Sequence, residues 1–193
     1  MAKLEEEKIN SRQVFAGRLL KVRVDTVRLP NGVESTREVV EHPGAVAVIA
    51  LTPDRELILV RQYRQAAGEV MLEVPAGVPL AGEEGAAAAR RELEEETGWR
   101  ARSVKKLFEG YASPGYSNEV IQFFLAEELT LFQQKTDEDE LIEVVKLPLD
   151  EARALLRTGK IKDNKTILAV MAVDLTAKGE GNWKPANELR GFQ

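Results

Sequence analysis

The stretch of the sequence that most constrains the fold runs from Gly77 to Trp99 and reads GVPLAGEEGAAAARRELEEETGW. Its middle predicts a helix, because four consecutive alanines are followed by arginine, glutamate and leucine, which are strong helix formers. Gly98 stands where a residue in the left-handed conformation would end this helix. Ala89 and Leu93 share one stripe of the predicted helix, which would face a hydrophobic core.

A neighbouring face of the same predicted helix is acidic. Glu92, Glu95 and Glu96 have the i, i+3, i+4 spacing that places three carboxylates on one side. Like charges at this spacing cost roughly 0.2–0.5 kcal/mol per pair, and the end of a helix favours cations. Crowded carboxylates repel one another unless they bind a proton or a cation, and oxygen-only ligands suit Mg²⁺ or Mn²⁺. A lone run of glutamates is more often a solvated face, so the spacing of the surrounding residues has to decide.

Fixed positions extend through the whole stretch. Gly77 is followed after five residues by Glu83, and after seven more by Arg91-Glu92-Leu93. One residue later come Glu95-Glu96, and one residue after these Gly98-Trp99. This pattern matches the Nudix box throughout, so the chain resembles a Nudix hydrolase. The resemblance implies an α/β/α sandwich with a mixed sheet over about residues 43–180.

The resemblance also implies roles for the box residues. Glu92 and Glu96 would be the main ligands of a catalytic Mg²⁺ (or Mn²⁺ or another divalent cation), together with the backbone carbonyl of Ala76. Glu95 would bind or bridge a second ion. Arg91 would orient the carboxylates through bidentate hydrogen bonds, and Glu83 would brace the loop of the box. The structural positions of the box would then be Gly77, Glu83, Arg91 and Gly98.

Composition excludes several other classes of protein. The 193 residues include 27 basic and 32 acidic side chains without a basic stripe, which argues against nucleic acid or an anionic membrane as the main partner. The absence of cysteine excludes disulfides, zinc–thiolate sites and thiol nucleophiles. It also argues against the related isopentenyl-diphosphate isomerases, which depend on a catalytic cysteine. We see no secretory signal and no segment that could span a bilayer, so we expect a cytoplasmic protein.

The order of the predicted elements is strands, helix, strands, helices, which indicates an α/β fold with helices on a mixed sheet. The first ten residues are polar and predict a frayed end or the start of a short helix. We expect strands at 12–15, 19–29, 34–41, 45–51, 56–64, 71–74, 104–111, 119–126 and 141–147, and helices at 150–158 and 164–177. The domains would be a small antiparallel sheet at 1–42 and a Nudix hydrolase domain at 43–193, with the box at 77–99. About three strands are too few to stand alone, so the first sheet must pack on the rest of the chain or on a second subunit.

Outside the box the chain resembles the ADP-ribose pyrophosphatase branch of the family. The sequence LEVPAG leads into the box, Pro114 lies sixteen residues past Gly98, and an N-terminal sheet precedes the domain. The resemblance implies a homodimer that exchanges this sheet, and metal-dependent hydrolysis of ADP-ribose to AMP and ribose 5-phosphate. Arg64 would bind the diphosphate, for which a fork of donors is suited, although an ordinary surface arginine is the alternative. The substrate-binding set would be Arg37 as a second clamp, Arg64, Glu73, Pro114 and Gly115.

The general base in this branch usually comes from a loop after the box. The acidic segment 137–140 stands where that loop is expected, with Glu140 as the first candidate, Glu138 as the second and Glu95 as a further one. An acidic loop outside such a family would be interpreted as solvated. Two alternatives for the function remain open. One is the same chemistry on another nucleoside diphosphate derivative, such as GDP-mannose or a dinucleoside polyphosphate. The other is a sensor that binds ADP-ribose without cleaving it, against which the intact box glutamates argue.

Overall fold

A computed structural model describes residues 4–134 and 141–177 of the chain. Contacts divide the chain into two compact units. Of the described residues, the first unit contains 4–44 and 110–121, and the second contains 45–109, 122–134 and 141–177. The proposed boundary after residue 42 does not anticipate that residues 110–121 belong to the first unit.

The first unit is built on a three-stranded antiparallel sheet in the order β1-β2-β3. These strands are β1 (Glu7–Ala16), β2 (Lys21–Arg28) and β3 (Glu34–Glu41), so the predicted meander is confirmed. Asp25, on the central strand, is buried and accepts hydrogen bonds from Ser11 at 2.6 Å and from Arg23 at 3.0 Å. The expectation of a frayed or helical first segment is wrong, because β1 begins at Glu7. All ten of its side chains are exposed, so no alternation of apolar residues could reveal it.

A loop from the second half of the chain completes the first unit. The Val40 N–H, on β3, donates to the carbonyl of Tyr116 at 2.7 Å, and the Asn118 N–H donates to the Val40 carbonyl at 3.2 Å. The loop that carries Pro114 and Gly115 is therefore fixed to the end of β3, with both of these residues exposed.

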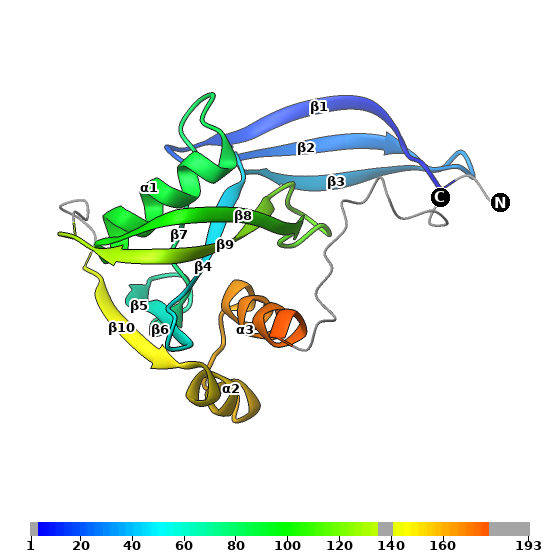
Figure 1. Cartoon of the computed structure of the whole chain (residues 1–193). Helices are drawn as coiled ribbons and strands as arrows, with labels where there is room; N and C mark the ends of the chain where they lie inside the picture. The colour runs from blue at the N-terminus through cyan, green and yellow to red at the C-terminus, as the bar shows by residue number, and fades with distance from the viewer. Residues whose placement is uncertain (1–3, 135–140, 178–193) are drawn as a thin grey trace. The chain divides into compact units, whose positions relative to one another are not determined.

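The second unit contains a seven-stranded sheet with helices packed on it (Figure 1). The main path of the sheet runs β10-β5-β4-β9-β8, β6 pairs with β5, and β7 pairs with β4. The elements are β4 (Ala45–Leu51), β5 (Glu56–Arg64), β6 (Glu69–Glu73), β7 (Ala76–Gly77), α1 (Gly85–Thr97), β8 (Trp99–Tyr111), β9 (Val120–Leu131), β10 (Glu143–Pro148), α2 (Leu149–Arg157) and α3 (Asn164–Ala177). The α/β fold class with its mixed sheet and N-terminal sheet is thus as predicted.

The core under α1 explains why the box forms a helix with one buried face. Ala88, Ala89 and Leu93 are fully buried and pack in one cluster with strand residues that include Val48 and Ile58. The helix ends at Gly98, whose φ of 74° places it in the left-handed region, and whose N–H donates to the carbonyl of Glu94. Packing of the alanine stripe therefore fixes the rotation of α1 and leaves its carboxylates beside the sheet.

The bounds of most elements follow the sequence pattern closely. β4, β5 and α3 have the predicted bounds, whereas β8 and β9 are longer than predicted. Among residues 4–134 and 141–177, no helix has the length and apolar character needed to cross a membrane.

Candidate active site

The loop before the box is fixed to the sheet as the short strand β7. In the register of β4 and β7, Val46 lies opposite Gly77 and Ala47 lies opposite Ala76. The segment just before β7 is held too, because the Val48 N–H donates to the carbonyl of Pro75 at 2.8 Å. Since α1 also packs on β4 and β7, the start of the box and its helix meet at one place.

Two carboxylates of α1 lie against this short strand. Glu92 and Glu96 are one turn apart and are both buried, at 9% and 5% exposure. Glu96 accepts a hydrogen bond from the Ala76 N–H at 3.1 Å. A β-carbon on Gly77 would lie 2.2 Å from the carboxyl carbon of Glu92, so only glycine leaves room for that carboxylate. Two buried carboxylates thus converge on the same two residues of backbone.

Arg91 connects the helix to the loop of the box. Its Nε and one terminal nitrogen donate to the two oxygens of Glu83 at 3.0 and 2.9 Å. The other terminal nitrogen donates to Glu92 at 2.8 Å and to Glu95 at 2.9 Å. Glu83 also accepts from the Leu80 N–H at 2.8 Å. The hydrogen bonds from Arg91 lower the pKa of Glu83, and the same bond to Glu83 raises the pKa of Arg91. Arg91 therefore has the contacts needed to orient Glu92 and Glu95.

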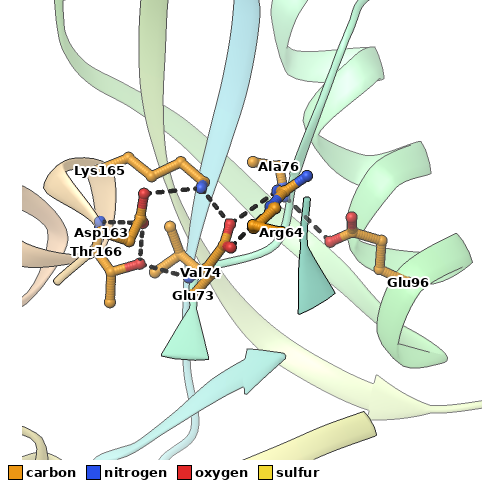
Figure 2. A network of polar contacts seen from close by, with 8 residues as sticks. All are labelled: Arg64, Glu73, Val74, Ala76, Glu96, Asp163, Lys165 and Thr166. Atoms are coloured by element: carbon orange, nitrogen blue, oxygen red, sulfur yellow. Dashed lines mark hydrogen bonds and ion pairs between the residues drawn. The ribbon is translucent and has the colours of Figure 1, made fainter. Parts of the chain in front are cut away.

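A second arginine is held beside the site by a buried carboxylate (Figure 2). Arg64, at the end of β5, donates from Nε and Nη2 to the two oxygens of Glu73, each at 2.8 Å. Glu73 is 1% exposed, whereas the side chain of Arg64 is 42% exposed. The bond to Glu73 raises the pKa of Arg64, and the charge of Glu96 acts in the same direction. One edge of the guanidinium, formed by Nε and Nη2, is thus bound to Glu73.

The network continues to the start of α3, which the sequence analysis did not connect to the site. Lys165 contacts both Glu73 and Asp163. Thr166 accepts a hydrogen bond from the Val74 N–H at 2.8 Å and donates one to Asp163. The contacts of Lys165 with Glu73 and of Thr166 with Val74 each join residues 92 positions apart. No local pattern in the sequence could have revealed these two long-range contacts.

Comparison with known proteins agrees with this geometry. The family model described as "NUDIX domain" matches residues 41–170, and the model described as "Nucleoside diphosphate sugar hydrolase N-terminal domain" matches residues 6–40. The chain belongs to the NUDIX family. The pattern of the box and the helix that presents its glutamates are those of this family.

Several relatives of this NUDIX chain have curated names. It is 42% identical to an ADP-ribose pyrophosphatase of Bacillus subtilis (strain 168), over 91% of this chain and 96% of the relative. It is 43% identical to a methanol dehydrogenase activator of Bacillus methanolicus, with the same coverage. A GDP-mannose pyrophosphatase of Yersinia enterocolitica is 41% identical over 70% of this chain and 76% of the relative. The crystal structure of an ADP compounds hydrolase superposes with a TM-score of 0.81 at 26% identity, covering 92% of this chain and 98% of the other.

The remaining predicted site residues that the structure describes lie in the first unit. Arg37 lies on β3 in the first unit, where it donates to Glu6 at 3.0 Å. Pro114 and Gly115 lie in the loop of the same unit. The predicted bases Glu138 and Glu140 fall outside the described residues.

The donor set beside β7 fits a hard divalent cation, although it is not a complete site. No group of three or more His, Cys, Asp or Glu side chains within residues 4–134 and 141–177 is arranged to hold a metal ion. Glu92 and Glu96 nevertheless provide two buried carboxylates, and the backbone of Ala76 lies beside the carboxylate of Glu96. Oxygen ligands of this kind suit Mg²⁺ or Mn²⁺ rather than a softer metal.

Proposed function

We propose that this NUDIX chain is a divalent-cation-dependent ADP-ribose pyrophosphatase, which hydrolyses the diphosphate of ADP-ribose to AMP and ribose 5-phosphate. The observation that carries the proposal is the pair of buried carboxylates, Glu92 and Glu96, against β7. The 42% identity to an ADP-ribose pyrophosphatase over nearly the whole chain supports the choice of substrate. In the reaction, the oxygen of water bonds to one phosphorus, the P–O bond to the bridging oxygen breaks, and a proton of the water passes to the proposed general base.

The cation would be held by Glu92 and Glu96 with the carbonyl of Ala76, and Glu95 is the proposed ligand of a second ion. When bound, a divalent cation polarises phosphoryl oxygens and lowers the pKa of coordinated water. Arg91 keeps Glu92 and Glu95 in fixed orientations through its bonds at 2.8 and 2.9 Å. We propose Mg²⁺ as the ion, with Mn²⁺ as an effective substitute, because both prefer oxygen ligands.

Arg64 is proposed to bind the diphosphate. Glu73 fixes one edge of its guanidinium, so little side-chain entropy remains to be lost when a phosphate binds the other edge. Arg37, Pro114 and Gly115 stay proposed contacts of the substrate. The proposed base is Glu140, with Glu138 and then Glu95 as alternatives.

A second candidate substrate is a sugar nucleotide such as GDP-mannose. The 41% identity to a GDP-mannose pyrophosphatase favours it, as does the family description of the N-terminal segment. Both reactions use the same box, so only the substrate distinguishes them.

A substrate panel with Mg²⁺ tests the proposal. We expect ADP-ribose to give the highest kcat/KM, with AMP and ribose 5-phosphate as products, and a chelator to abolish turnover. Glu96→Gln serves as the inactive control, because it keeps the size of a buried side chain and removes its charge. Faster hydrolysis of GDP-mannose than of ADP-ribose would transfer the assignment to sugar nucleotides.

We also propose a cytoplasmic homodimer that exchanges the N-terminal sheet. The strand β1 supports this, because Ile9, Val14 and Phe15 expose between 42% and 56% of their surface. Sedimentation velocity at micromolar concentration should give the mass of two chains, and Phe15→Glu should shift the equilibrium toward the monomer. A monomeric wild-type protein under these conditions contradicts the dimer. The absence of cysteine suits the reducing cytoplasm.

A further inference from the structure

Lys165 reaches the site from the start of α3, and its ammonium group lies between two carboxylates. Its Nζ contacts Oε2 of Glu73 and lies 3.1 Å from Oδ1 of Asp163. The side chain of Lys165 is 12% exposed. Figure 2 shows it approaching Glu73 from the side opposite Arg64.

The backbone around Lys165 is anchored independently of its side chain. Asp163 accepts a hydrogen bond from the Thr166 N–H at 2.9 Å, as expected for a residue that caps a helix start. The hydroxyl of Thr166 accepts from the Val74 N–H at 2.8 Å, which ties the same turn to the segment after β6. The ammonium group is therefore delivered to Glu73 by a fixed turn and not by a flexible terminus.

Glu73 needs both of its cations. A carboxylate that is 1% exposed loses its hydration, and the charge is tolerated only if it is paired and hydrogen-bonded. Burial raises the pKa of Glu73, but Arg64 and Lys165 more than offset this effect and lower it. The charged groups around Glu73 are Arg64 from β5, with Lys165 and Asp163 from the start of α3. Arg64 also experiences the charge of Glu96.

We propose that Lys165 is a positioning residue for the diphosphate of the substrate: it binds the far side of Glu73, and Glu73 in turn holds Arg64 in the orientation that binds phosphate. This inference rests on the proposed function of Arg64. Without Lys165, Glu73 would have one cation instead of two, and the fork between Glu73 and Arg64 would no longer be held in one geometry. A residue that acts in this way contributes to substrate binding without touching the substrate.

The kinetic test compares Lys165→Met with two other variants. We expect K165M to raise KM for ADP-ribose roughly 10-fold or more with little change in kcat. Arg64 would bind a charge that the diphosphate carries in both the ground state and the transition state, so a weaker contact affects substrate binding more than turnover. K165R, which keeps the positive charge, should lie closer to the wild type. K162M is the matched control. Lys162 pairs at 2.6 Å with Glu69, which lies at the other end of β6 from Glu73, and the side chain of Lys162 is 57% exposed. K162M should keep the wild-type KM.

A second measurement follows Arg64 without any substrate. The NMR signal of the Arg64 Nε–H group, assigned by its loss in Arg64→Lys, should be protected from exchange in the wild type and in K162M. It should exchange quickly in K165M. If K165M does not fold, K165Q carries the same test, because glutamine keeps a hydrogen-bond donor and removes the charge.

These outcomes separate the two proposals. A folded K165M with normal KM and a protected Arg64 signal overturns the role of Lys165, and so does a fall in kcat at unchanged KM. A wild-type protein that does not hydrolyse ADP-ribose refutes the proposed function, while the Arg64 signal still decides whether Lys165 positions this arginine.

Discussion

At the scale of single residues, the carboxyl group of Glu92 occupies the place where residue 77 would carry a β-carbon. Gly77→Ala must displace either β7 or Glu92, because the new carbon would lie 2.2 Å from the carboxyl carbon. We expect kcat/KM to fall by about 10–100-fold, the range for disturbed support of a metal ligand, while the protein stays folded. Gly110→Ala is the control, since its β-carbon meets nothing within 4 Å. Normal turnover of Gly77→Ala with the usual metal requirement would argue against Glu92 as a ligand.

The assignment of the general base is a second question at this scale. Glu138 and Glu140 lie outside the described residues, so their proposed role depends on sequence position and family resemblance alone. Glu140→Gln is expected to lower kcat by roughly a hundredfold or more with KM little changed, as for a positioned base. Measurement of Glu140→Gln beside Glu138→Gln and Glu95→Gln decides among the three candidates. Near-normal turnover of the first variant moves the role to one of the other two.

At the scale of elements, the end of α1 is closed by a segment more than thirty residues further along the chain. The Phe132 N–H donates to the carbonyl of Gly98 at 2.7 Å, and the side chain of Gln134 donates to the carbonyl of Glu96 at 2.6 Å. A β-carbon on Gly98 would lie 2.8 Å from the backbone nitrogen of Gln134. This glycine is thus required both by its positive φ and by close contact.

Two glycines with similar φ separate these requirements. Gly68 has φ of 71° with nothing within 4 Å of the β-carbon position, whereas Gly98 has φ of 74° and a crowded one. Gly68→Ala should lower the free energy of unfolding by about 1–2 kcal/mol, the cost of a left-handed alanine. Gly98→Ala should cost about 1–3 kcal/mol more, because the neighbouring backbone must move. Urea unfolding of both variants checks the difference, and equal losses would show that the contact with Gln134 contributes nothing.

The elements also show what the sequence can and cannot predict. The 3.6-residue period placed Leu93 in the core and Glu92 and Glu96 on one face, because local geometry determines which residues share a side of a helix. The strand β1 lacked such a signal, since neither of its faces is buried in the chain. The contacts of Lys165 and Thr166 with the segment before the box depend on how α3 packs, which no spacing within either segment encodes. The bounds of α3 were therefore predictable from the sequence, but the contacts of α3 with the site were not.

At the scale of the whole molecule, several paired carboxylates determine how stability depends on pH. For Glu73, burial raises the pKa, but Arg64 and Lys165 have the larger effect, so the pKa is lowered. The hydrogen bonds from Arg91 lower the pKa of Glu83. A carboxyl group whose pKa is lower in the folded than in the unfolded state stabilises the fold above the unfolded value, which is about 4.3 for glutamate. This contribution is lost as pH falls through the lowered folded pKa.

We therefore expect Tm to be nearly constant around neutral pH and to fall steeply below about pH 4.5. Glu83→Gln should have a lower Tm at pH 7 than the wild type and should lose less on acidification, because one linked group has been removed. Thermal melts of both proteins across this range provide the measurement. Parallel curves for the two proteins would show that Glu83 does not contribute to the acid response.

The separation of Glu73 from Lys165 has a consequence during protein synthesis. Glu73 is made 92 residues before its second cation, so the nascent chain has every residue of the box before it has the lysine that completes the pairing of this carboxylate. A chain that stops before α3 would keep Glu92, Glu96 and Arg91 but would lack Lys165 and its contact with Glu73. On the proposed role of Lys165, the ordering of Arg64 therefore waits until α3 has been made and has packed beside Glu73.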